Sequence, residues 1–89
     1  MIDEVNAKLQ SLLEELANGD DKDSQKVAEH VKKILALYDA GEIDDITRNE
    51  LLSDAKEIIA VEKSAATLEA KIKLDEISNM LVMIISNVI

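Results

Sequence analysis

The fold of this chain is decided by residues 47–89, which read TRNELLSDAKEIIAVEKSAATLEAKIKLDEISNMLVMIISNVI. No glycine or proline interrupts this run. Thr47 and Glu50 have the spacing of a capping box, and Ile46 and Leu51 have that of a hydrophobic staple, so a helix is predicted to begin near residue 48. If it continued unbroken to residue 89, this helix would be roughly 60 Å long.

Two apolar stripes run along this segment when it is read as a helix. The first runs its full length and consists of Leu52, Ala55, Ile59, Ala66, Ala70, Leu74, Ile77, Leu81, Ile84 and Val88. The second lies on a different side and consists of Leu51, Ile58, Val61, Ala65, Leu68 and Ile72. A helix with two apolar sides must be covered on two sides. Either the run breaks, near residues 63–64 or 74–75, or another chain supplies the cover.

Two shorter helices precede this run. Apolar residues from Ile2 to Leu16 recur every three or four positions and predict a helix over about residues 3–18, with Gly19 in the left-handed conformation that ends it. A second helix is predicted over about residues 24–40, capped by Asp23 or Ser24 and ending before Gly41. Each would be about 25 Å long, so the resulting hairpin is too short to cover a 60 Å rod.

The composition supports an all-α protein with one domain. The chain has 89 residues, no proline, no cysteine and only two glycines, and 47% of its residues are hydrophobic. A sequence with so few helix breakers is neither disordered nor typical of a β-sandwich. The predicted fold is therefore all-α: an N-terminal helical hairpin followed by a long C-terminal helix, unbroken or broken once, in a helical bundle completed by oligomerisation.

The charge excludes several classes of partner. Nineteen acidic residues against ten basic ones give a net charge of −9, which would repel nucleic acids and anionic membrane surfaces. The only aromatic residue is Tyr38, so bases have no stacking platform. The first residues, Met1 to Glu4, lack the basic and apolar regions of a signal peptide, and a cytoplasmic location is expected.

No residue pattern predicts catalysis, a cofactor or a metal site. Residues 39–50 have the length of an EF-hand loop, but Gly41 and Ile43 stand where oxygen ligands are needed. His30 is the only histidine, and no cysteine is available to share a metal ion with it. Acidic neighbours such as Glu14 and Glu15 point apart on a helix and form poor acid–base pairs. The chain is therefore predicted not to be an enzyme.

The C-terminal residues favour a protein–protein contact. Residues 77–89 carry no charged side chain, and at 13 residues they are too few to span a bilayer. The predicted interaction residues are Leu74, Ile77, Met80, Leu81, Met83, Ile84, Ile85 and Val88. They predict a structural or assembly protein that self-associates through its C-terminal helix as a homodimer or higher oligomer.

An acidic regulator or inhibitor that binds a different protein is the alternative, and one form of it is a DNA mimic that blocks a nucleic-acid-binding protein. In size and charge the chain resembles the small acidic helical proteins that are common among phage accessory and virion-assembly proteins.

Overall fold

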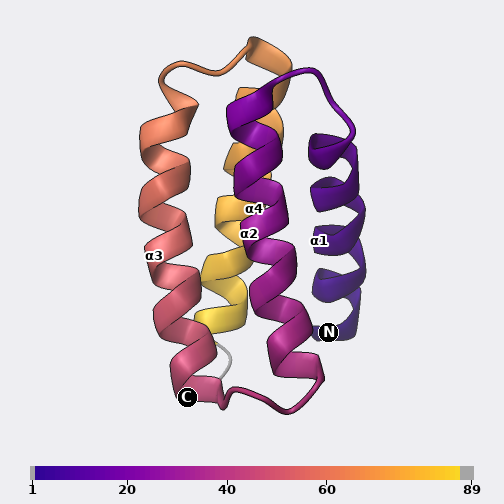
Figure 1. Ribbon diagram of the computed structural model, residues 1–89, viewed down its shortest axis with the longest axis vertical. Helices are drawn as coiled ribbons and strands as arrows, with labels where there is room; N and C mark the ends of the chain where they lie inside the picture. Colours follow the sequence, from indigo (N-terminus) through magenta and orange to yellow (C-terminus); the bar gives the residue numbers. More distant parts are fainter. Residues whose placement is uncertain (1, 87–89) are drawn as a thin grey trace.

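The chain folds into a bundle of four antiparallel helices. The computed structural model describes the backbone of residues 2–86 and the side chains of residues 4–86. The helices are α1 (Ile2–Ala17), α2 (Lys22–Asp39), α3 (Asp45–Lys63) and α4 (Leu68–Ser86). Each helix packs against two others, so that α1 contacts α2 and α4, and α3 also contacts α2 and α4 (Figure 1). The helices α2 and α4 therefore occupy one diagonal of the bundle.

The expected long C-terminal helix is wrong, because the chain turns back at residues 64–67. The hydroxyl of Ser64 donates to the carbonyl of Val61 (2.8 Å), and the Ala65 amide donates to the carbonyl of Glu62 (3.1 Å). Thr67 then caps α4, since its Oγ1 accepts from the amide of Ala70 at 3.3 Å. The turn lies at the first of the two positions considered from the sequence, and residues 74–75 are continuous helix inside α4.

Two aspartates, rather than the residues expected, cap the middle helices. Asp21 accepts from the amide of Ser24 at 3.1 Å, so α2 begins at Lys22 and not near residue 24. Asp44 accepts from the amide of Thr47 at 2.8 Å, so α3 begins at Asp45 and Thr47 is not its cap. In both helices the aspartate stands three residues before the hydroxyl residue whose amide it satisfies.

The glycines differ in how they end the first two helices. Gly41 has a φ of +77° and follows α2 in a Schellman motif, in which the Gly41 amide donates to Tyr38 and the Glu42 amide to Leu37, each at 3.0 Å. Gly19 follows α1 but is not left-handed, contrary to the sequence expectation. Its amide instead donates to the carbonyl of Leu16 at 3.2 Å.

The first apolar stripe forms half of the hydrophobic core. Its buried members are Leu52, Ala55 and Ile59 on α3, with Ala70, Leu74, Ile77, Leu81 and Ile84 on α4. The hairpin of α1 and α2 covers them with Leu9, Leu12, Leu13, Leu16, Val27, Ala28, Val31, Ile34 and Leu35. The hairpin is long enough because the run folds back on itself, giving helices of 16 to 19 residues throughout.

The bundle measures 33 × 23 × 20 Å, with a Cα radius of gyration of 12.2 Å. A globular chain of this length is expected to have a radius of gyration of about 12 Å, so the four helices form a fully compact unit. Among the described residues, none of the helices combines the length and the apolar character that crossing a membrane requires.

Candidate functional site

The predicted interaction residues fall into three groups in the bundle. Five of them, namely Leu74, Ile77, Met80, Leu81 and Ile84, are buried in the core formed by the chain's own helices. Ile85 is half-buried at the edge of that core, and Met83 is 49% exposed. Val88 lies outside the described residues. In this conformation, only Met83 and part of Ile85 offer surface to another protein.

The exposed apolar side chains are distributed unequally over the four helices. Among the described residues, seven large hydrophobic side chains are exposed, namely Ile46, Ile58, Val61, Leu68, Ile72, Val82 and Met83. All seven belong to α3 or α4, and none to α1 or α2. Scattered single apolar residues are normal on a protein surface, but their concentration on one pair of helices makes α3 and α4 the candidate contact surface.

Helix α4 carries the most regular set of these residues. We define the outer face of α4 as its nine exposed residues: Leu68, Glu69, Ile72, Asp75, Glu76, Asn79, Val82, Met83 and Ser86. Leu68 is 76% exposed and Ile72 is 55% exposed at one end, and Val82 and Met83 lie at the other. Asp75 and Glu76 lie between the two apolar ends. Apart from Glu69, which pairs with Lys73, the outer face of α4 is therefore apolar, acidic and again apolar along its length.

The lysines near this face lie beside it and are only partly exposed. Both lysines of α4, Lys71 and Lys73, are half-buried, so no basic residue belongs to the outer face. Lys73 pairs with Glu69 at 3.3 Å, and Lys63 at the end of α3 pairs with Asp75 at 2.5 Å. Among the described residues, Glu76 has no ion-pair partner. The middle of the face therefore keeps an uncompensated negative charge.

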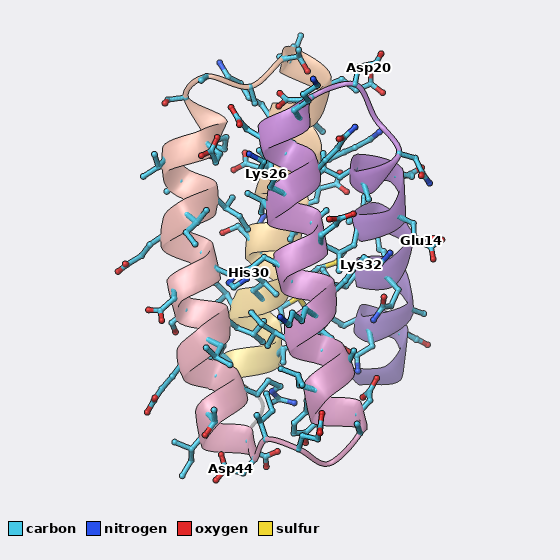
Figure 2. The ribbon with its side chains drawn as sticks, in the orientation of Figure 1. Glu14, Asp20, Lys26, His30, Lys32 and Asp44 are labelled. Atoms are coloured by element: carbon cyan, nitrogen blue, oxygen red, sulfur yellow. The ribbon has the colours of Figure 1, made fainter. Side chains whose placement is uncertain are left out.

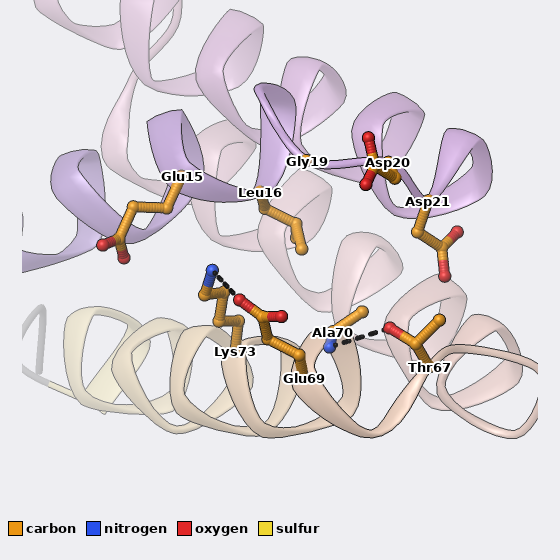
Figure 3. Close-up of a pocket in the computed structure, with 9 residues that line it drawn as sticks. All are labelled: Glu15, Leu16, Gly19, Asp20, Asp21, Thr67, Glu69, Ala70 and Lys73. Carbon is orange, nitrogen blue, oxygen red and sulfur yellow. Dashed lines mark hydrogen bonds and ion pairs between the residues drawn. The ribbon is translucent and has the colours of Figure 1, made fainter.

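A cleft of about 370 Å³ lies where the end of α1 meets the beginning of α4. Figure 3 shows Glu15 and Leu16 on one wall and Glu69 and Lys73 on the other, with Asp20 and Asp21 in the connecting loop. The amine of Lys73 is used by Glu69 within the cleft. Across the described residues, no three histidine, cysteine or carboxylate side chains are placed to hold a metal ion.

The remaining polar cluster joins α2 to α3 at the opposite end of the bundle. The Tyr38 hydroxyl donates to Asp45 at 2.5 Å, and the Arg48 guanidinium lies 4.3 Å from the centre of the Tyr38 ring. The hydrogen bond to Asp45, together with desolvation, raises the pKa of Tyr38 above its usual value of 10.0. The Tyr38 side chain therefore links α2 to the beginning of α3.

His30 lies on the exposed side of α2 together with Lys26, and Figure 2 shows both side chains projecting from that helix. Neither is paired with a carboxylate in an ion pair among the described residues. The exposed residues of α2 are polar or small, and they include three lysines (Lys22, Lys26 and Lys33) and three carboxylates (Asp23, Glu29 and Asp39). This lysine-bearing surface lies diagonally across the bundle from the outer face of α4.

Sequence reasoning found part of the outer face of α4 without recognising it as a surface. Leu68 and Ile72 belong to the second apolar stripe, which was expected to need covering, and Met83 was named as an interaction residue. Val82, which is 41% exposed, was missed. The sequence spacing could have revealed Val82. Starting from Leu68 and Ile72, alternate steps of three and four residues lead through Asp75 and Asn79 to Val82.

Comparisons with known proteins add no relative: no protein-family model, no curated protein and no solved structure matches this chain.

Proposed function

We propose that this chain is a non-enzymatic protein-binding bundle whose partner lays a helix along the outer face of α4. The observation that carries the proposal is that, among the residues whose side chains are described, all seven exposed large hydrophobic ones lie on α3 and α4. Covering the four on α4 would remove apolar surface from water at about 25 cal/mol per Å², a gain of a few kcal/mol. A cytoplasmic location, expected from the acidic composition, is part of the same proposal.

The spacing of the outer face supports a helix as the contacting element. Leu68, Ile72, Asp75, Asn79 and Val82 follow one another at intervals of four and three residues. This alternation is the seam along which two helices pack side chains into each other's gaps. A flat or extended partner would gain nothing from such a regular spacing.

Two classes of partner are compatible with this face. One is a second copy, which is the self-association predicted from the C-terminal helix, now transferred from the buried side of α4 to its outer face. The other is a different protein, for which this chain would act as an acidic regulator or inhibitor. The net charge of −9 favours the second class, because it opposes the approach of another copy.

Site-specific photo-crosslinking in cells tests the proposal. A photoreactive amino acid replaces Ile72 on α4, and the matched control replaces Ala36, which is exposed on α2. We expect position 72 to form a discrete adduct, identified by mass spectrometry, that position 36 does not form. An adduct containing a second copy would assign self-association, and one containing another protein would assign the regulator. Equal labelling at both positions would refute binding through α4.

A further inference from the structure

Resting on the proposed function, we infer that the partner on the outer face of α4 is a cationic amphipathic helix of a different protein. Its contacting side carries apolar residues at both ends and lysine or arginine between them. The apolar ends cover Leu68 and Ile72 on one side and Val82 and Met83 on the other. The cationic residues lie opposite Asp75 and Glu76.

The pattern of the face sets the spacing of the partner. Ile72 and Val82 are ten residues apart in α4. At 1.5 Å per residue they are separated by about 15 Å along the helix axis. A partner helix that reaches both ends must therefore carry apolar residues about ten positions apart, with its cationic residues roughly midway.

A second copy that pairs symmetrically does not fit this pattern. In a parallel pair of α4 helices, Asp75 and Glu76 of one copy lie beside the same residues of the other. In an antiparallel pair that matches apolar ends, Asp75 of one copy faces Glu76 of the other. Because the carboxylates lie between the apolar ends, any pairing that covers both ends opposes acid to acid, which disfavours association.

A second copy that docks its α2 surface on this face does not fit either. The lysine-bearing surface of α2 would offer Lys22, Lys26 and Lys33 to Asp75 and Glu76, although it also exposes the carboxylates Asp23, Glu29 and Asp39. None of the exposed large hydrophobic side chains is on α2, however, so the apolar ends of the α4 face would be covered by lysines and small residues. The α2 surface therefore offers lysines to the carboxylates of the α4 face but no large apolar side chains to its apolar ends.

The charges around the face complete the argument for a cationic partner. The exposed residues of α4 include three carboxylates, Glu69, Asp75 and Glu76, and no basic residue. Asp75 is paired with Lys63 but remains 62% exposed, and Glu76 has no ion-pair partner among the described residues. Lysine or arginine on the partner would find these carboxylates accessible, and their attraction would steer the approach of the two proteins.

Two synthetic helical peptides of about 18 residues provide the test. Both carry leucines spaced to match the apolar ends of the face; the first has lysines in the middle and the second has glutamates at the same positions. Binding of each fluorescent peptide to the full chain is followed by anisotropy. We expect the lysine peptide to bind, with an affinity that falls as salt is raised from about 0.1 M to about 0.5 M, and the glutamate peptide not to bind.

Matched variants locate the binding on α4. Glu76→Lys reverses a charge on the outer face of α4, and Glu29→Lys makes the same change at an exposed position on α2. We expect Glu76→Lys to weaken binding of the lysine peptide by about tenfold and Glu29→Lys to leave it unchanged. Ile72→Ser should also weaken binding, because it removes an apolar contact. The milder Glu76→Gln, and circular dichroism of every variant, separate loss of binding from loss of folding.

The outcomes separate this inference from the proposed function. No binding of the lysine peptide, or equal binding of both peptides, overturns the inference, as does binding that Ile72→Ser leaves unchanged. A wild-type dimer that tightens in Glu76→Lys also overturns it, but leaves binding through α4 intact with a second copy as the partner. If position 72 formed no crosslink beyond that of the control position 36, the proposed function itself would be refuted.

Discussion

Ser24 is the one residue of the described side chains whose polar atom is buried without a hydrogen-bond partner. It is fully buried at the beginning of α2, where Asp21 accepts from its amide but nothing pairs with its hydroxyl. A buried hydroxyl without a partner is unfavourable, so we expect Ser24→Ala to raise the free energy of unfolding by about 1 kcal/mol. Urea denaturation measures this. Ser53→Ala, at an exposed position in α3, controls for the higher helix propensity of alanine. A loss of stability specific to Ser24→Ala would show that the hydroxyl is satisfied in solution.

Asp44 gives the bundle a pH dependence of defined sign. Its hydrogen bonds with Thr47 lower the pKa of Asp44 below the usual value of 3.8. A lowered pKa means that the cap stabilises the fold above the unfolded-state pKa, and that this contribution is lost as pH falls through the lowered, folded-state pKa. Asp44→Asn keeps a capping oxygen that does not titrate.

We therefore expect the wild type to melt above Asp44→Asn near neutral pH, with the difference in Tm shrinking as the pH falls below the usual pKa of 3.8. The comparison isolates Asp44, because every other carboxylate titrates in both proteins. A difference in Tm that stays constant as the pH falls would mean that the Asp44 carboxylate does not cap α3 in its charged form.

The caps also show what single residues in a sequence can and cannot reveal. Asp21 and Ser24 are both good caps, as are Asp44 and Thr47, and each pair is three residues apart. The sequence predicted Asp23 or Ser24 as the cap of α2 and, from capping-box spacing, Thr47 as that of α3, but the structure uses Asp21 and Asp44. Local spacing alone cannot choose between them, because the choice depends on which residues the bundle buries. Starting α2 at Lys22 places Ser24 inside the helix and inside the core.

At the scale of elements, the two glycines predict different costs for the same substitution. Gly41 has a φ of +77°, a conformation that a side chain disfavours, although no atom lies within 4 Å of the position its Cβ would take. We expect Gly41→Ala to destabilise the bundle by about 1 kcal/mol through backbone strain alone. Gly19→Ala places its Cβ 3.4 Å from the carbonyl of Leu16, an ordinary contact, without such strain. It should change stability by less than about 0.5 kcal/mol. Equal costs in thermal unfolding would contradict the Schellman motif after α2.

The turn between α3 and α4 was the element least predictable from the sequence. The apolar stripe passes from Ile59 through Ala66 to Ala70 without a change of period, and residues 64–67 contain no glycine or proline. Every local signal therefore allows a continuous helix. The break is favoured by the whole chain, because only a folded-back run can be covered by helices of equal length. The first two helices, by contrast, were predicted to within about two residues, since their periodicity and their ends agree.

At the scale of the molecule, the core and the candidate surface were not equally predictable. An apolar stripe shows that a helix side is to be covered, but not whether by the same chain or by another. Leu74 and Ile77 were therefore assigned to an interface and lie in the core, whereas Leu68 and Ile72 belong to the stripe that remains exposed. Which stripe is left uncovered depends on the packing of four helices, and only the three-dimensional arrangement decides it.

The size of the isolated protein tests the bundle and its charged surface together. With carboxylates opposing any symmetric pairing through α4, we expect light scattering to give the monomer mass over a roughly hundredfold range of concentration. Small-angle X-ray scattering should then give a radius of gyration slightly above the Cα value of 12.2 Å, because side chains and hydration add to it. An isolated 60 Å helix alone would give a radius of gyration of about 17 Å, so an extended C-terminal rod is readily distinguished.

A concentration-dependent rise in mass would instead indicate that apolar burial outweighs charge repulsion and that the partner is a second copy. If Ile72→Ser abolished that rise while Ala36→Ser did not, the contact would lie on α4.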